Sequence, residues 1–175
     1  MEESREQRSE TAYKKLATNL DEMTKSYRSL LDLIRKEKDF LIQSEVKKLA
    51  ENNELKENML IKIKTLDGAR ERYAKELADL VGADAEAPRL LDLAQKMNGP
   101  KGDNLRTVHA TLELLVRRAT EINRENEVYA NSALKSLDGS LSNIKDTLVG
   151  KNTYERKGKL AYGPEKAGNF VSKEG

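Results

Sequence analysis

The sequence predicts an all-α fold, an elongated antiparallel helical bundle or coiled coil of long helices with a flexible C-terminal tail. Apolar residues recur at spacings of three and four over most of residues 13–149, as in helices that bury one face. The chain of 175 residues is 37% hydrophobic and 35% charged, with two Phe and no Trp. This composition favours a thin seam of Leu and Ile with much solvated surface over the thick core of a compact enzyme. Residues 1–150 form the predicted helical domain, and residues 151–175 form the tail.

The first long helix is predicted from a stripe that begins at Tyr13, because residues 1–10 are charged and are expected to fray. Its apolar positions are Tyr13, Leu16, Leu20, Met23, Tyr27, Leu30 or Leu31, and Ile34. Ser44 is a residue type that caps helices, but no Gly or Pro near it forces a break. A turn near Gln43–Glu45 and one continuous helix therefore remain equal alternatives.

A second periodic segment follows and is expected to end at Gly82. It contains Val46, Leu49, Met59 or Leu60, Ile63, Leu66, Tyr73, Leu77 and Leu80. Residues 82–88 read as a linker, and Pro88 suits the first turn of a short helix over Pro88–Met97. Residues 98–102, which contain two glycines and a proline, predict a break before the last helix.

The last predicted helix, Asn104–Val149, is the longest and contains no proline. At ~1.5 Å per residue it would be roughly 70 Å long, so long partners must lie along it. Asp103 or Asn104 is the expected N-cap, and Gly150 lies where a glycine stops a helix. The stripe runs through Leu112, Leu115, Ala119, Ile122, Ala130, Ala133, Leu137, Leu141, Ile144 and Leu148.

The C-terminal end of this helix carries the candidate binding residues, which are Leu134, Leu137, Leu141, Ile144 and Leu148. One interpretation is an internal bundle seam. The other, which we favour, is an exposed face that captures a partner's amphipathic helix, because the short Pro88–Met97 helix cannot cover the whole length. Gly139 lies within this segment, where it is either tolerated or loosens the last turns so that they adapt to a partner.

Polar residues on the helical stripes favour structural roles over chemistry. Asn123 and Asn126 lie on or beside the last stripe, where an amide typically fixes register at some cost in stability. His109 is the single histidine and the chain has no cysteine, so neither a metal site nor a general base can be assembled around it. No nucleophile–base set is recognisable. The sequence therefore predicts a protein that is not an enzyme, with no catalytic residue, no metal site and no cofactor.

Charge and hydropathy exclude two further classes of partner. The chain has 32 Lys and Arg against 30 Asp and Glu, which are interspersed, so no uncompensated basic face predicts nucleic-acid binding. No apolar run approaches the ~20 residues that span a bilayer, which argues against direct membrane insertion. The polar N-terminus lacks the apolar segment of a signal peptide. We therefore expect a cytoplasmic protein.

The tail, residues 151–175, has a different character from the rest of the chain. It contains six Lys and Arg against three Glu and has few aliphatic residues. It cannot bury enough apolar area to offset its ordering entropy, so we expect it to be flexible. Its aromatic residues are Tyr154, Tyr162 and Phe170, and isolated aromatics in a basic tail are candidate docking anchors.

Several of these features recur in order in one known family. The first set is Glu37, Leu41, Leu60, Ile63, Leu66 and Arg70; the second is Ile122-Asn123-Arg124-Glu125-Asn126, the seam from Leu134 to Leu148, Gly150, and Tyr154-Glu155-Arg156-Lys157-Gly158. Over Leu30–Gly158 the chain resembles the FlgN-type flagellar export chaperones. It departs from them in a longer tail after Gly158 and a longer charged N-terminus.

The resemblance implies an all-helical protein without enzymatic activity. Such chaperones bind the C-terminal helices of flagellar hook–filament junction proteins in the cytoplasm, prevent their premature assembly and deliver them to the type III export gate. The resemblance maps cargo binding onto the end of the last helix, the five residues named above. It maps binding to the cytoplasmic domain of the membrane export gate onto Tyr154.

Two other functions compete with this one. The first alternative is a structural coiled-coil adaptor or scaffold that self-associates through its own seams. A homodimer that ignores salt and binds no cargo would favour it. The second is a helical protein that binds RNA or DNA, which would require binding that weakens steeply with salt.

Overall fold

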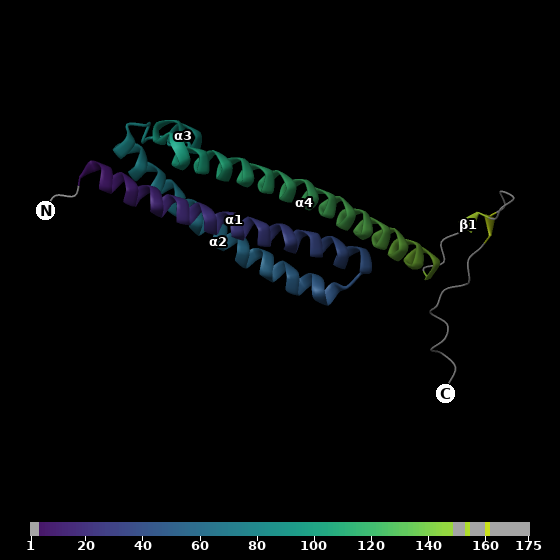
Figure 1. Cartoon of the computed structure of the whole chain (residues 1–175). Coiled ribbons are helices and arrows are strands. Elements are labelled where there is room, and N and C mark those ends of the chain that lie inside the picture. Colours follow the sequence, from purple (N-terminus) through teal and green to yellow (C-terminus); the bar gives the residue numbers. More distant parts are fainter. Residues whose placement is uncertain (1–3, 149–152, 155–159, 162–175) are drawn as a thin grey trace. The chain divides into compact units, whose positions relative to one another are not determined.

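The computed structural model describes residues 4–148, 153–154 and 160–161. The chain divides into two compact units, residues 1–126 and 127–175, which are described separately below. Its helices are α1 (Arg5–Gln43), α2 (Val46–Val81), α3 (Leu90–Met97) and α4 (Gly99–Leu148), and its strands are β1 (Thr153–Tyr154) and β2 (Leu160–Ala161) (Figure 1). The all-α prediction is confirmed, since each strand has only two residues.

Helix α1 begins at Arg5, earlier than the stripe suggested, because Ser4 and Gln7 form a capping box. The Ser4 hydroxyl accepts from the Gln7 backbone N–H at 3.2 Å, and the Gln7 side chain accepts from the Ser4 backbone N–H at 3.0 Å. These bonds satisfy amides that the first helical turn leaves unpaired. The expectation that residues 1–10 fray is therefore wrong for residues 5–10, which are helical.

The chain turns at Ser44, which settles the open choice between a hairpin and one continuous helix. Ser44 has a left-handed backbone with φ 57°, and the Glu45 N–H donates to the Phe40 carbonyl at 3.0 Å. This is the bonding pattern that ends a helix, with serine in the place usually taken by glycine. Ser44 thus ends α1 and does not cap α2, whose N-cap is Glu45.

Gly82 ends α2, as predicted. Its φ of 71° is a conformation that glycine adopts without a steric penalty, and the Ala83 N–H donates to the Ala78 carbonyl at 3.0 Å. Residues 82–89 form the connection to α3. The short helix begins at Leu90, so the prediction that Pro88 occupies its first turn is wrong; Arg89 is its N-cap.

Helix α4 begins at Gly99, so the predicted break at residues 98–102 is confined to one residue, Asn98. The start expected at Asp103 or Asn104 is wrong, because Pro100 lies in the first turn, where its missing N–H costs nothing. The backbone of α3 approaches closely here. A Cβ on Gly102 would lie 2.4 Å from the Ala94 carbonyl oxygen. The predicted stop at Gly150 lies outside the described residues.

In the first unit three long helices alternate in direction. Residue numbers rise along α1 as they fall along α2: Arg5 Nε donates to the Leu80 carbonyl at 2.9 Å, and Lys56 binds Glu37 at 2.6 Å. Helix α4 runs parallel to α1, because Lys101 pairs with Glu10 near one end and Asn126 bonds to Ile34 near the other. Figure 1 shows α1 and α2 side by side.

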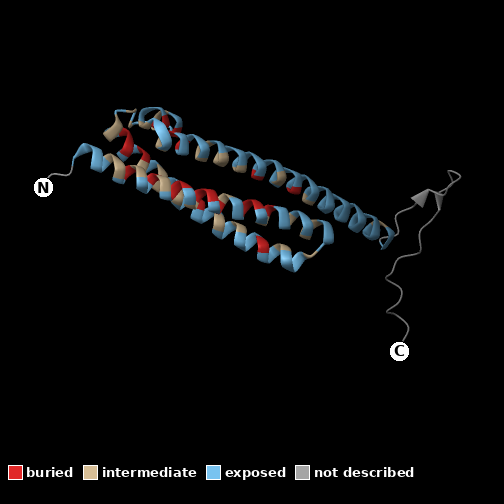
Figure 2. Cartoon of the chain, viewed as in Figure 1, coloured by how far each residue is buried: buried red, intermediate tan, exposed pale blue. Residues whose placement is uncertain are grey.

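The core of the first unit lies between these helices, where the buried residues, drawn in red in Figure 2, form two clusters. One cluster contains Ala12, Leu16, Leu20, Met23, Ala74, Leu77, Ala78, Leu90, Leu93, Ala94 and Leu105. A second cluster contains Leu30, Leu31, Ile34, Ile63 and Ala119. Most stripe residues predicted for α1 are in these clusters, so the spacing of three and four does mark the buried face there.

The second unit contains the last part of α4 and the two strands. Thr153 pairs with Ala161 and Tyr154 with Leu160 in an antiparallel arrangement. The tail was expected to be flexible without secondary structure. Its described residues form this short pairing, and the remainder of residues 151–175 lies outside the described part.

Candidate partner-binding face

The end of α4 carries a row of exposed aliphatic side chains, which we call the aliphatic stripe. Its members and exposed fractions are Leu134 59%, Leu137 60%, Leu141 63%, Ile144 56% and Leu148 72%. All five candidate binding residues are therefore accessible, and none is sealed in a seam of the described chain. Residues 127–148 contain no fully buried side chain, in contrast to Leu105 and Ala119 earlier in the same helix.

The surroundings of the stripe differ from those of the earlier helices. Residues 131–148 contain only four charged residues, and most of the remainder between the aliphatic residues are Ser, Asn, Thr, Ala or Gly. Short side chains leave the Leu and Ile side chains standing above the surface and let another backbone approach closely. Five aliphatic residues that are more than half exposed on one helix face indicate an interaction surface rather than scattered surface residues.

A polar cluster joins all three long helices near the end of the first unit; we call Glu37, Lys56 and Asn126 the polar clamp. Lys56 Nζ lies 2.6 Å from Glu37 Oε2, and these side chains are only 15% and 13% exposed. The amide of Asn126, itself buried, donates to the same carboxylate oxygen at 3.0 Å and to the Ile34 carbonyl at 2.9 Å. One carboxylate thus holds α2 and α4 against α1.

Two further asparagines lie on the helices that the polar clamp joins to α1. Asn52 is buried and donates to the Leu33 carbonyl at 3.0 Å, while Asn123 Oδ1 lies 3.5 Å from Lys56 Nζ. Asn126 therefore has the structural role that its place on the stripe favoured, and Asn123 lies at the margin of the cluster. Sequence reasoning missed the pairing of Glu37 with Lys56, because the two residues are 19 positions apart on different helices.

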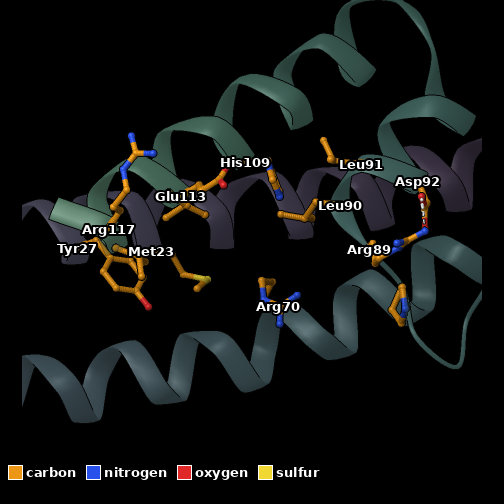
Figure 3. Close-up of a pocket in the computed structure, with 13 residues that line it drawn as sticks. Met23, Tyr27, Arg70, Arg89, Leu90, Leu91, Asp92, His109, Glu113 and Arg117 are labelled. Atoms are coloured by element: carbon orange, nitrogen blue, oxygen red, sulfur yellow. Dashed lines mark hydrogen bonds and ion pairs between the residues drawn. The ribbon is translucent and has the colours of Figure 1, made fainter. Parts of the chain in front are cut away.

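A groove of about 730 Å³ opens between α1, α2, α3 and α4 in the first unit (Figure 3). Its apolar lining residues include Met23, Leu90 and Leu112, and arginines from three parts of the chain also line it, namely Arg70, Arg89 and Arg117. Tyr27 lines one wall, where burial raises the pKa of its phenol. The sequence does not predict this groove. Apolar residues recur at the same spacing along a helix whether its neighbours pack closely against it or leave a gap.

The family model described as FlgN protein matches residues 3–161, which include the whole bundle, the polar clamp and the aliphatic stripe. The chain belongs to the FlgN family. The family consists of flagellar export chaperones, so the protein is one in that general sense. No curated protein and no solved structure matches the chain significantly.

Membership of the FlgN family is in accord with a chain that binds rather than catalyses. FlgN proteins are chaperones and are not known as enzymes. Among the described residues, no three His, Asp or Glu side chains gather as metal ligands. His109 lines the groove together with Leu90 and Leu112. No helix in the described part of the chain is long and apolar enough to cross a membrane.

Two other predicted positions lie in the second unit of this FlgN chain. Gly139 is helical, and a Cβ added there would meet nothing within 4 Å, so no packing requires a glycine. Tyr154 is in β1, paired through its backbone with Leu160. Sequence position alone gave no sign of this pairing.

Proposed function

We propose that this chain is a cytoplasmic export chaperone whose aliphatic stripe binds the C-terminal helical region of flagellar hook–filament junction proteins. The exposure of all five stripe residues supports the proposal, together with the family to which the chain belongs. Covering the stripe removes apolar surface from water, and each Leu or Ile that becomes buried is worth roughly 1.5–3 kcal/mol. A junction protein held in this way would be kept from premature assembly, because its own helical surface is occupied.

If the stripe binds a partner helix, shortening one of its side chains should weaken the affinity in proportion to the apolar surface lost. Leu141→Ala removes three carbons at ~0.8 kcal/mol each, which corresponds to a roughly 50-fold loss of affinity for a junction-protein segment. The matched control is Leu114→Ala, which truncates another exposed leucine of α4. Isothermal titration of both variants with junction-protein C-terminal segments measures the effect. Equal affinities of Leu141→Ala and the unaltered chain would refute the assignment.

Delivery to the export gate is the second part of the proposal, and we assign it to Tyr154. The resemblance in the tail supports this assignment, since Tyr154-Glu155-Arg156-Lys157-Gly158 follows the stripe. Tyr154→Ala should leave the affinity for junction-protein segments unchanged and should weaken binding to the cytoplasmic domain of the membrane export gate. Tyr162→Ala is the control for the loss of a tail tyrosine. If the two variants bind the gate domain equally well, Tyr154 has no special role.

A further inference from the structure

A single residue, Asn98, separates α3 from α4, and it is the only asparagine of the chain that precedes a glycine. Its backbone has φ 49° and ψ 173°. Residues other than glycine rarely adopt this conformation, which costs on the order of 1–3 kcal/mol. The next residue, Gly99, has φ 54°. Two successive residues with positive φ therefore make the sharp connection between the helices, and Asn98 is strained there.

The side chain of Asn98 and the backbone N–H of Gly99 are both left without a protein partner. Asn98 is exposed, and its carboxamide forms no hydrogen bond within the described part of the chain. Gly99 is the first residue of α4, where a backbone N–H has no acceptor inside the helix. No bond from this N–H to α3 is found among the described residues either. Neither group is held by another interaction.

These two groups can react with each other. The Gly99 backbone nitrogen, on losing its proton, attacks the side-chain carbonyl carbon of Asn98, and the new N–Cγ bond closes a five-membered succinimide ring. The side-chain nitrogen leaves as ammonia. Water then opens the ring. Cleavage at Cγ gives aspartate, whereas cleavage at the backbone carbonyl carbon gives isoaspartate, in which the main chain runs through Cγ. Glycine has no Cβ to obstruct the attack.

We propose that Asn98 is a site of non-enzymatic modification, at which the folded chain exchanges the side-chain amide for a carboxylate, as aspartate or isoaspartate. Aspartate fits the position well. The Asn98 carbonyl accepts from the Gly102 N–H at 3.2 Å, as an N-cap residue does, and asparagine and aspartate cap helices about equally well. A negative charge at the start of α4 is also favourable for the helix dipole.

The fold protects the other places where the same ring could close. Asp67 precedes Gly68 and Asp138 precedes Gly139, and each pair could form a succinimide with loss of water. Both pairs lie inside helices, where the glycine N–H donates to a carbonyl four residues earlier. The nitrogen that would attack is therefore committed to a hydrogen bond. Asn98 differs because Gly99 begins its helix.

The two products should affect the bundle differently. Isoaspartate adds one atom to the main chain between α3 and α4, next to a tightly packed contact. A Cβ on Gly102 would lie only 2.4 Å from the Ala94 carbonyl oxygen. A longer connection shifts the start of α4 relative to α3, so isoaspartate should lower the unfolding midpoint. Aspartate keeps the main-chain path and should leave the midpoint unchanged.

Peptide mapping by mass spectrometry tests the proposal on the full chain, incubated folded in buffer and, in parallel, unfolded in guanidinium chloride. In the folded chain Asn98 should convert at least about tenfold faster than any other described asparagine, since the others lie in helices and precede larger residues. An isoaspartyl methyltransferase with S-adenosylmethionine measures the isoaspartate. Asn98→Gln should remove that signal, because its longer side chain would have to close a six-membered ring.

Two outcomes would overturn the proposal. One is an Asn98 that stays intact in the folded chain under conditions that convert it in the unfolded chain. The other is an isoaspartate signal that Asn98→Gln leaves undiminished, which would place the reaction elsewhere. Asn98→Asp separates the charge from the longer main chain. This variant should unfold at the same denaturant concentration as the unaltered chain, whereas the incubated chain should gain a fraction that unfolds at a lower one.

Discussion

The polar clamp makes a sharp prediction, because the bundle contains a matched pair of interhelical carboxylate–lysine contacts. Glu37 and Lys56 lie 2.6 Å apart and are 13% and 15% exposed, whereas Glu125 and Lys38 lie 2.8 Å apart and are 60% and 48% exposed. We consider Glu37→Gln and Glu125→Gln, two isosteric changes that remove one negative charge each. The geometry is similar in both pairs, so the difference in burial should decide the outcome.

Glu37→Gln should destabilise the bundle by about 2 kcal/mol. The change weakens two hydrogen bonds to a charged acceptor, those from Lys56 and Asn126, and bonds of this kind contribute roughly 1.5–3 kcal/mol each. It also leaves the Lys56 ammonium largely buried without a counter-charge. The remaining amide oxygen still accepts a bond, which keeps the loss below the sum. Glu125→Gln should lower the unfolding midpoint much less than Glu37→Gln, because water solvates both partners.

Urea unfolding followed by helical circular dichroism measures both variants, with the unfolding midpoint and slope fitted separately. A third variant, Lys56→Met, tests the origin of the effect. If the charge pair is responsible, the double variant Glu37→Gln, Lys56→Met should be more stable than Glu37→Gln alone. Equal midpoints for Glu37→Gln and Glu125→Gln would refute the reasoning, since burial would then make no difference to the pair.

Three further predictions concern glycines and acid stability. Gly102→Ala should lower the unfolding midpoint despite alanine's higher helix propensity, because its Cβ would lie 2.4 Å from the backbone oxygen of Ala94. The Cβ of Gly139→Ala would meet no neighbour, so the change should increase helicity measured by circular dichroism, with a gain of up to ~1 kcal/mol for the helix. A changed dissociation rate of a bound junction-protein segment would indicate that Gly139 is a hinge, and an unchanged rate would indicate a tolerated glycine. Lys38 holds the pKa of Glu125 below its usual value, so this pair should stabilise the bundle above about pH 4.5 and stop doing so as pH falls through the lowered pKa. Glu125→Gln should remove that part of the acid dependence of the urea midpoint.

The sequence predicted the helices well where apolar spacing carried the signal, and less well at their ends. Gly82 was recognised as a stop because glycine there has a plain conformational reason. The start of α1 was placed too late, because the capping box of Ser4 and Gln7 lies outside the apolar stripe. The start of α4 was also placed too late. Pro100 stands between two glycines, a pattern that predicts a loop, although proline is also common in the first turn of a helix.

The candidate site was only partly predictable, for a physical reason. Spacing identifies one apolar face but does not say what covers it, so Leu20 and Leu141 look alike in sequence. The structure distinguishes them, since Leu20 is fully buried and Leu141 is 63% exposed. The polar clamp was beyond sequence reasoning, because a glutamate on a helix resembles any solvated glutamate until a lysine from another helix is placed beside it.

The bundle seam of α4 and the aliphatic stripe, which we propose as the partner-binding face, follow different registers. The seam runs through Leu115, Ala119, Ile122 and Asn126 in steps of three and four, and the stripe, at Leu134 and Leu137, lies one residue later than the continuation of those steps. Apolar residues that are buried in a stable bundle should not bind a partner protein. Conversely, apolar residues that bind a partner should not be buried in the bundle. The shift of one residue after Asn126 separates the two, because a helix that packs in the bundle register does not present Leu134 and Leu137 as its a and d residues. Asn126 is the last residue of the first register, and its amide is bonded to both the Ile34 carbonyl and Glu37. Asn126 opposes sliding of α4 by one turn. Such a shift would bring another residue of the seam beside Glu37 and would leave its carboxylate without the amide donor.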